Sequence, residues 1–121
     1  MTIDSNILIA YLNGERKVVD TLREWNEEGR TLFISSVSVY EALSLPRLDP
    51  SDIEKTKTFL DGFFSVPFDD GIAETAALLR RIYRLAFPDA AIAATAIKYG
   101  VPLVTRDQDF RVVKEVQIIE I

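Results

Sequence analysis

The chain of 121 residues contains no cysteine and no histidine. Without cysteine, a disulfide framework and a thiol nucleophile are both excluded. Without histidine as well, the sequence lacks the thiolate and imidazole ligands that enclose structural zinc. Hydrolytic chemistry in this chain must therefore use carboxylates, which bind hard, oxygen-seeking cations such as Mg²⁺ or Mn²⁺.

The sequence also lacks long apolar runs and an excess of positive charge. No apolar run is long enough to cross a bilayer, and a strand-like segment follows Met1 directly, so neither a membrane span nor a signal peptide is expected. We therefore expect a cytoplasmic protein. The net charge of −5 argues against a general nucleic-acid coat, because phosphate contacts require clustered Lys and Arg. A local basic patch beside an acidic pocket is compatible with this charge.

The length and the hydrophobic content of 48% predict one domain over residues 1–121. Strands are expected at residues 2–4, 31–35, 101–105 and 116–121, with a weak strand at 65–68. Helices are expected at residues 5–12, 15–28, 36–44, 49–64, 69–86 and 88–100. Strands that alternate with helices predict an α/β fold with a parallel sheet covered on both faces.

Four carboxylates stand where a plain soluble fold would not need them, namely Asp4, Glu41, Asp89 and Asp107. Ligands in parallel α/β folds bind outside the carboxyl ends of the strands. Asp4 and Asp107 lie at or just past such ends. Asp89 begins a helix rich in Ala and Ile, where a carboxylate at the edge of an apolar layer needs a cation or hydrogen-bond donors.

Each acid also has a structural explanation. Asp4 can be the N-cap of the helix that follows it, and Glu41 stands three residues after Ser38, which is the spacing of a capping box. Asp89 follows a proline in a first helical turn, where the helix dipole favours a carboxylate. Asp107 lies in a polar turn, where Asp is common. Taken one at a time, the acids leave both interpretations open.

Taken together, the acids favour a metal site. Asp4 lies between an apolar strand and an apolar helix, and no Lys or Arg is close in sequence to Asp4 or Asp89. A bound divalent cation is the economical partner for such carboxylates. Several carboxylates that converge on a cation are how two-metal phosphodiesterase sites are built.

Four segments, in order, resemble the motifs of the PIN domain and, within it, of the VapC-like toxin ribonucleases of toxin–antitoxin pairs. The first motif is matched by IDSNILIAYL, with Asp4 as its acid and Asn6 as its companion. The second is matched by ISSVSVYEAL, which carries Glu41. The third is matched by PDAAIAATAIKYG, which carries Asp89.

The fourth motif is matched by VPLVTRDQDF, with Thr105 and Asp107. Asp109 competes with Asp107 for the acidic role. Asp107 is preferred because it lies closer to the strand end and to Thr105, whose hydroxyl can orient a carboxylate or a water. The resemblance spans the whole chain and implies a PIN-like three-layer α/β/α sandwich with a central parallel sheet of four to five strands.

The resemblance implies a Mg²⁺- or Mn²⁺-dependent endoribonuclease that cleaves RNA phosphodiester bonds. By that likeness, Asp4, Asp89 and Asp107 hold the metal. Glu41 completes the site or positions the attacking water.

Two groups of basic residues are candidates for contacts with RNA phosphates. Arg16 and Lys17 follow the first motif, and Arg80, Arg81 and Arg84 lie on the helix that leads to the third. Solvated helix faces would give the same pattern.

The resemblance also implies a cognate antitoxin and a homodimer. The amphipathic helices can line a groove for a partner helix, with Tyr11, Trp25 and Tyr40 as candidate anchors. Core packing is the alternative role for these aromatic residues, above all for Trp25.

Three other functions are alternatives to a toxin ribonuclease. The chain can be an RNA-processing PIN nuclease without an antitoxin, or a PIN-like module that binds RNA or protein without cutting. A phosphotransfer domain is the third. An aspartyl phosphatase needs Asp-x-Asp after its first strand, and Asp4-Ser5-Asn6 lacks the second acid. A phospho-accepting receiver needs a Lys just past a late strand, which Thr105-Arg106-Asp107 does not supply.

Overall fold

A parallel sheet of five strands forms the centre of the computed structural model, which covers residues 1–121. In chain order the strands are β1 (Thr2–Ile3), β2 (Phe33–Ser35), β3 (Phe64–Val66), β4 (Leu103–Val104) and β5 (Ile118–Ile119). They lie side by side in the order β3-β2-β1-β4-β5, and every pair is parallel. The predicted parallel sheet is confirmed, with β1 at its centre.

Six α-helices and one 3₁₀ helix connect the strands. They are α1 (Ser5–Leu12), α2 (Arg16–Glu27), α3 (Ser36–Leu43), α4 (Pro50–Leu60), α5 (Asp70–Tyr83), α6 (Phe87–Tyr99) and the 3₁₀ helix η1 (Gln108–Val112). The six α-helices correspond to the six expected from the sequence. The 3₁₀ helix η1 was not predicted.

Two predicted helices end earlier than their sequence patterns indicate. The helix expected over residues 49–64 ends at Leu60, because Phe64 begins β3 and donates its N–H to the carbonyl of Leu32 at 2.9 Å. The helix expected over residues 69–86 ends at Tyr83. Arg84 follows with a left-handed backbone conformation (φ 58°), which terminates the α-helix.

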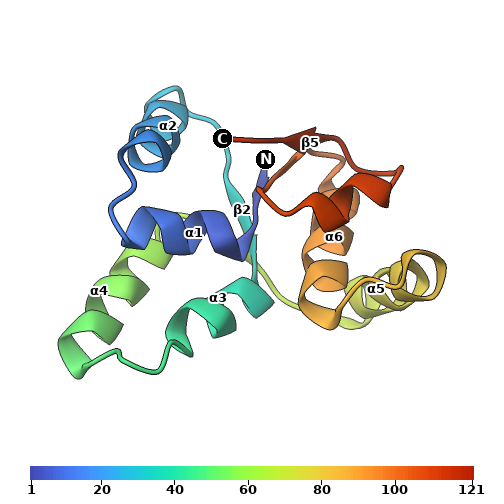
Figure 1. Ribbon diagram of the computed structural model, residues 1–121, viewed down its shortest axis with the longest axis horizontal. Helices are drawn as coiled ribbons and strands as arrows, with labels where there is room; N and C mark the ends of the chain where they lie inside the picture. The colour runs from blue at the N-terminus through green and yellow to red at the C-terminus, as the bar shows by residue number, and fades with distance from the viewer.

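Helices cover both faces of the sheet, with α1 to α4 on one side and α5 and α6 on the other (Figure 1). Each face has its own hydrophobic core. Neighbouring strand residues serve different cores, because side chains alternate along a strand. In β4, Leu103 packs in the core with α5 and α6, whereas Val104 packs in the core with α1 and α2. The three-layer α/β/α arrangement is thereby confirmed.

Helix α6 lies deepest in the molecule. It packs against α5, α3 and the strands β1 and β2, and every residue from 90 to 96 is buried. Its alanines explain this position, because small side chains let several elements approach one helix. The segment that the sequence marks as rich in Ala and Ile is thus buried along residues 90–96.

The position at which α3 begins rules out one structural explanation of Glu41. Ser35 is the N-cap of α3, and its hydroxyl accepts the N–H of Val37 at 3.1 Å. The capping box expected for Ser38 and Glu41 is therefore wrong, because α3 begins before Ser38 and Glu41 lies well inside the helix. The proposed N-cap at Asp4 is correct, since its side chain accepts the N–H of Ser5.

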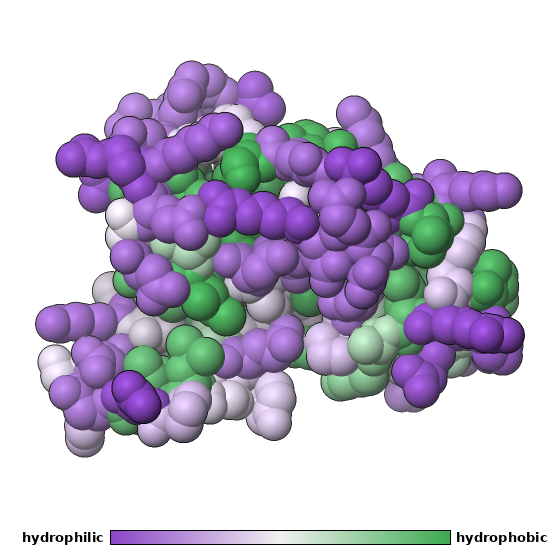
Figure 2. Space-filling model, in the orientation of Figure 1, coloured by the Kyte–Doolittle hydropathy of each residue, from purple (hydrophilic) through white to green (hydrophobic).

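The surface is mixed. The face seen in Figure 2 is mostly hydrophilic, and hydrophobic residues appear on it as separate areas. Tyr40 is the most exposed of the large hydrophobic side chains at 71%. None of the helices combines the length and the apolar character that a membrane span needs.

Candidate functional site

The candidate site lies where the strands end. Because all strands are parallel, their carboxyl ends meet at one edge of the sheet. Helix α1 starts one residue after the end of β1, and α3 starts directly after β2. Helix α3 packs against both α1 and α6, so the first turns of α1, α3 and α6 lie near one another at this edge (Figure 1).

Asp4 stands between β1 and α1 and is 4% exposed. Its Oδ1 accepts the backbone N–H of Ser5 at 2.7 Å, and its Oδ2 accepts the hydroxyl of Thr105 at 2.6 Å. Both carboxylate oxygens therefore have a donor within the protein. Asp4 is an N-cap and is also joined to the end of β4.

Thr105 connects two of the acids from its buried position after β4. While its hydroxyl donates to Asp4, the same oxygen accepts the backbone N–H of Asp107 at 2.9 Å. The carboxylate of Asp107 in turn accepts the N–H of Asp109 at 2.9 Å, and Asp107 is thereby the N-cap of η1. A chain of hydrogen bonds therefore runs from the end of β1 to the start of η1.

Three acids come close enough to share one ion. Carboxylate oxygens of Asp89, Asp107 and Asp109 all lie within 4.8 Å of one another. Asp89 and Asp107 are half-buried, whereas Asp109 is exposed. Asp107 and Asp109, the two candidates for the fourth acid, therefore both place a carboxylate oxygen near Asp89. Asp4 lies outside this group of three.

The acids raise one another's proton affinity. Burial raises the pKa of Asp89 to about 6, and the negative charges of Asp107, Asp4, Asp109 and Glu41 add to the shift.

Burial also raises the pKa of Asp4 to about 6, although the hydrogen bonds from Thr105 and Ser5 oppose the shift. The charges of Asp107 and Glu41 again raise it.

No basic side chain neutralises this group. None of the ion pairs in the structure includes Asp4, Glu41, Asp89, Asp107 or Asp109. The side-chain oxygen of Asn6, two residues after Asp4, is buried and accepts no hydrogen bond. The atoms that these residues offer to a metal are all oxygens. The residues therefore fit a hard divalent cation such as Mg²⁺ or Mn²⁺ better than zinc.

Glu41 approaches the site from the middle of α3. It is half-buried, and its Oε1 accepts the hydroxyl of Ser5 at 2.6 Å. The Ser5 hydroxyl also lies 2.8 Å from that of Ser38, which is fully buried. We did not single out Ser5 from the sequence as a site residue. The only local signal is a hydroxyl directly after Asp4.

The basic candidates do not form one patch. Arg84 lines a hollow of about 350 Å³ together with Asp89 and Asp109. Arg80 instead donates to the carbonyl of Leu85 at 3.0 Å.

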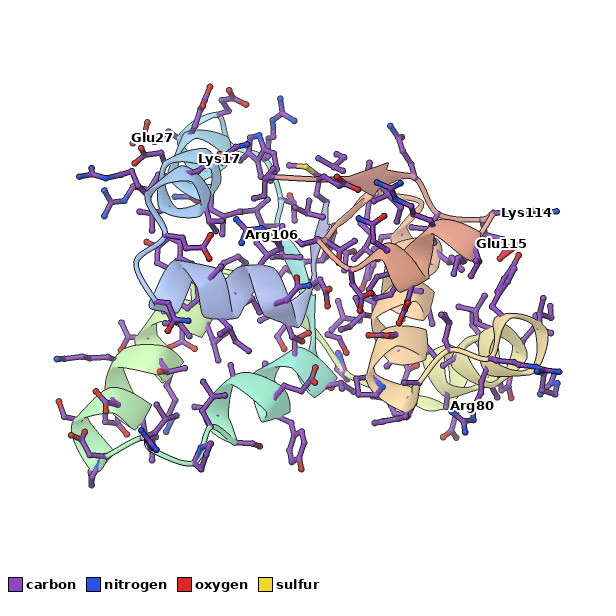
Figure 3. All side chains as sticks on the ribbon, viewed as in Figure 1. Lys17, Glu27, Arg80, Arg106, Lys114 and Glu115 are labelled. Carbon is purple, nitrogen blue, oxygen red and sulfur yellow. The ribbon has the colours of Figure 1, made fainter.

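Lys17 on α2 and Arg80 on α5 lie on opposite flanks of the molecule (Figure 3). Arg16 and Arg81 are exposed on these same two helices. Of the five basic candidates, Arg84 alone lines the hollow beside the acids.

Comparisons with known proteins identify the family of this fold. Residues 1–116 match the family model of the PIN domain. Among solved structures, a chain of a toxin–antitoxin complex from Klebsiella pneumoniae is 28% identical, with a TM-score of 0.83, over 98% of this chain and 94% of that one.

Two further solved structures share the fold at lower identity. A chain of VapBC2 from Rickettsia felis, bound to a DNA fragment from its promoter, is 19% identical with a TM-score of 0.85, over 99% of this chain and 97% of that one. A chain of FitAcB from Neisseria gonorrhoeae is 23% identical with a TM-score of 0.78, over 98% and 95%. No curated protein matches the chain. The match over nearly its whole length shows that this chain belongs to the PIN domain family.

Proposed function

We propose that the protein is a divalent-metal-dependent endoribonuclease and the toxin of a VapBC-type toxin–antitoxin pair. Membership of the PIN domain family supports a nuclease, and the likeness to chains of toxin–antitoxin complexes supports the toxin role. The observation that carries the proposal is the group of Asp89, Asp107 and Asp109 oxygens within 4.8 Å, next to the buried Asp4 and without a basic partner.

In this proposal Asp4, Asp89 and Asp107 hold Mg²⁺ or Mn²⁺, and Asp109 lies close enough to share the ion. The chemistry that such a metal would supply is activation of the attacking water and neutralisation of charge on the scissile phosphate. Without it, the clustered carboxylates repel one another, and this repulsion adds to the effect of burial in raising the pKa of Asp89.

The protein's own part in the reaction falls to carboxylates, because the chain has no histidine. Glu41 is suited to complete the metal site and to position the attacking water. Its Oε1 is held by Ser5, whereas its Oε2 accepts no hydrogen bond within the protein. Arg84 makes no ion pair and lines the hollow beside Asp89, so we assign it to a phosphate of the RNA.

An antitoxin is the proposed protein partner, and a homodimer is expected from the likeness to the family. A second hollow, of about 160 Å³, is lined by residues of α1, α2 and α4, including Tyr11, Leu22 and Phe59, and by Phe63, which follows α4. We propose that an apolar segment of the antitoxin binds there.

The three aromatic anchors expected from the sequence lie in different settings. Tyr11 stacks on Phe59 at 4.4 Å beside this hollow. Trp25 is half-buried against the core, while Tyr40 is exposed. Tyr11 is therefore the best placed of the three for a partner at this hollow.

RNA cleavage by the purified protein tests the proposal. We expect wild type to cleave single-stranded RNA with Mn²⁺ or Mg²⁺ and to stop when a chelator is added. Asp89→Asn should lower the rate by about 100-fold or more, the order that loss of a catalytic group costs. Asp61→Asn, at an exposed position after α4, is the matched control and should cleave like wild type. Equal cleavage by Asp89→Asn and wild type would contradict the assignment.

A further inference from the structure

We propose that Ser5 is a positioning residue, whose side-chain hydroxyl holds the carboxylate of Glu41 in the acidic site. The inference rests on the proposed function, because it gives Glu41 a role beside the metal. Ser5 is the first residue of α1 and is 6% exposed. Its contacts join α1 to α3 at the edge of the sheet.

Ser5 contacts two acids through two different groups. Its backbone N–H donates to Oδ1 of Asp4 at 2.7 Å, and its hydroxyl donates to Oε1 of Glu41 at 2.6 Å. A substitution of the side chain therefore removes the contact with Glu41 and leaves the backbone contact with Asp4. This separation makes the role of the hydroxyl testable by itself.

The direction of the hydrogen bonds follows from the number of protons. A serine hydroxyl has one proton to donate, and a carboxylate can only accept. Ser5 therefore donates to Glu41, and Ser38 donates to the oxygen of Ser5 at 2.8 Å. Ser38 lies one helical turn before Glu41 on α3 and is fully buried. The three side chains form a relay in the order Ser38, Ser5, Glu41.

Glu41 depends on this relay more than the other acids depend on their donors. Both oxygens of Asp4 accept hydrogen bonds, and Asp107 accepts one from the backbone of η1. Glu41 has a longer side chain and accepts only the hydroxyl of Ser5. Without that hydroxyl, a half-buried carboxylate would lose its sole donor within the protein, and its rotamers would be released.

Calorimetric titration with Mn²⁺ tests the inference. We expect Ser5→Ala to raise the dissociation constant for Mn²⁺ by about 10-fold or more, the range found for partners that orient metal ligands. Ser5→Thr retains a hydroxyl and should keep most of the affinity. Ser44→Ala is the matched control, because its hydroxyl donates only to the carbonyl of Tyr40 within α3. It should bind Mn²⁺ like wild type.

A double-mutant cycle separates positioning from a general structural effect. If Ser5 acts through Glu41, Ser5→Ala should change the Mn²⁺ affinity by less than about twofold in a Glu41→Ala background. An equal loss in both backgrounds would overturn the inference, and so would wild-type affinity in either Ser5→Ala or Glu41→Ala. Circular dichroism and thermal melts in chelator verify that each variant is folded.

RNA cleavage by the same proteins distinguishes the two proposals. If wild type binds Mn²⁺ and does not cleave RNA, the ribonuclease assignment fails. The Ser5 inference is then still decided by the Mn²⁺ affinities of the single and double variants.

Discussion

Asp4 and Asp89 share one acidic site and a raised pKa of about 6, but the protein holds them in different ways. Asp4 is 4% exposed, and both of its oxygens accept hydrogen bonds, from Ser5 and Thr105. Asp89 lies in the first turn of α6 and is half-buried. Its carboxylate accepts no hydrogen bond from a side chain or from the backbone.

The difference separates two kinds of carboxylate in the candidate site. Asp4 has a structural role as well, because it caps α1 and ties β1 to the end of β4. Asp89 has only the repulsion of its neighbours, chiefly Asp107, in addition to the cost of burial. We therefore expect substitution of either acid to lower activity. In the metal-free protein, substitution of Asp4 should lower the stability, whereas substitution of Asp89 should leave it unchanged or raise it.

The largest change in unfolding free energy should come from removing the hydroxyl of Thr105, which donates a hydrogen bond to Asp4. Thr105→Val keeps the shape of a fully buried side chain and removes the hydroxyl that holds Asp4. It leaves a buried carboxylate oxygen and the N–H of Asp107 without their partner, which costs about 1–3 kcal/mol of unfolding free energy. Denaturant unfolding in chelator measures this loss.

Thr95→Val is the matched control for that variant. Thr95 is equally buried, but its hydroxyl donates only to the carbonyl of Ala91 within α6. Its loss should cost clearly less than the loss of the Thr105 hydroxyl. Equal losses for the two threonines would contradict the role given to Thr105.

The second prediction compares the two acids directly. Asp4→Asn replaces an oxygen that accepts a hydrogen bond with an amide that donates, so the metal-free protein should lose about 1 kcal/mol. Asp89→Asn removes only repulsion and burial of charge, so it should leave the stability unchanged or raise it by about 1 kcal/mol. Thermal melts in chelator compare the two variants, and a loss in Asp89→Asn equal to that in Asp4→Asn would remove the distinction.

The smallest effect is the pH dependence of stability. The pKa of Asp4 and of Asp89 is about 6 in the folded protein, above the ordinary value of 3.8. Between these values the folded state binds more protons than the unfolded state, so stability falls as pH rises from 5 to 7. In chelator, wild type should be more stable at pH 5 than at pH 7, by about 1 kcal/mol after solvent screening. Asp89→Asn should flatten this dependence, and a profile equally steep in both proteins would assign the effect elsewhere.

Much of the fold could be predicted from the sequence, because local periodicity records which face of each element is buried. One such local pattern is the pair Leu103 and Val104, which pack in the two different cores. Another is the series of alanines in α6, which are buried. The four acids stand out in the sequence for the same reason, since each lies at a strand end, at a helix start or in an otherwise apolar segment.

The contacts within the site could not be predicted, because they join residues far apart in the chain. Thr105 reaches Asp4 across 101 positions, and Ser5 reaches Glu41 across 36. Such pairs depend on strand register and helix packing, which no local pattern encodes. The approach of Asp109 to Asp89 depends likewise on η1, a short 3₁₀ helix without a strong sequence signal.

The binding of Mn²⁺ to the folded protein tests the central claim most directly. We predict that wild type melts at a higher temperature as Mn²⁺ is added, because an ion that binds only the folded state stabilises it, by about 2.7 kcal/mol at 100 times its dissociation constant. Asp89→Asn should gain much less, although it is at least as stable as wild type in chelator. Melting temperatures that do not respond to millimolar Mn²⁺ in wild type, or that rise equally in Asp89→Asn, would contradict a metal centre at these acids.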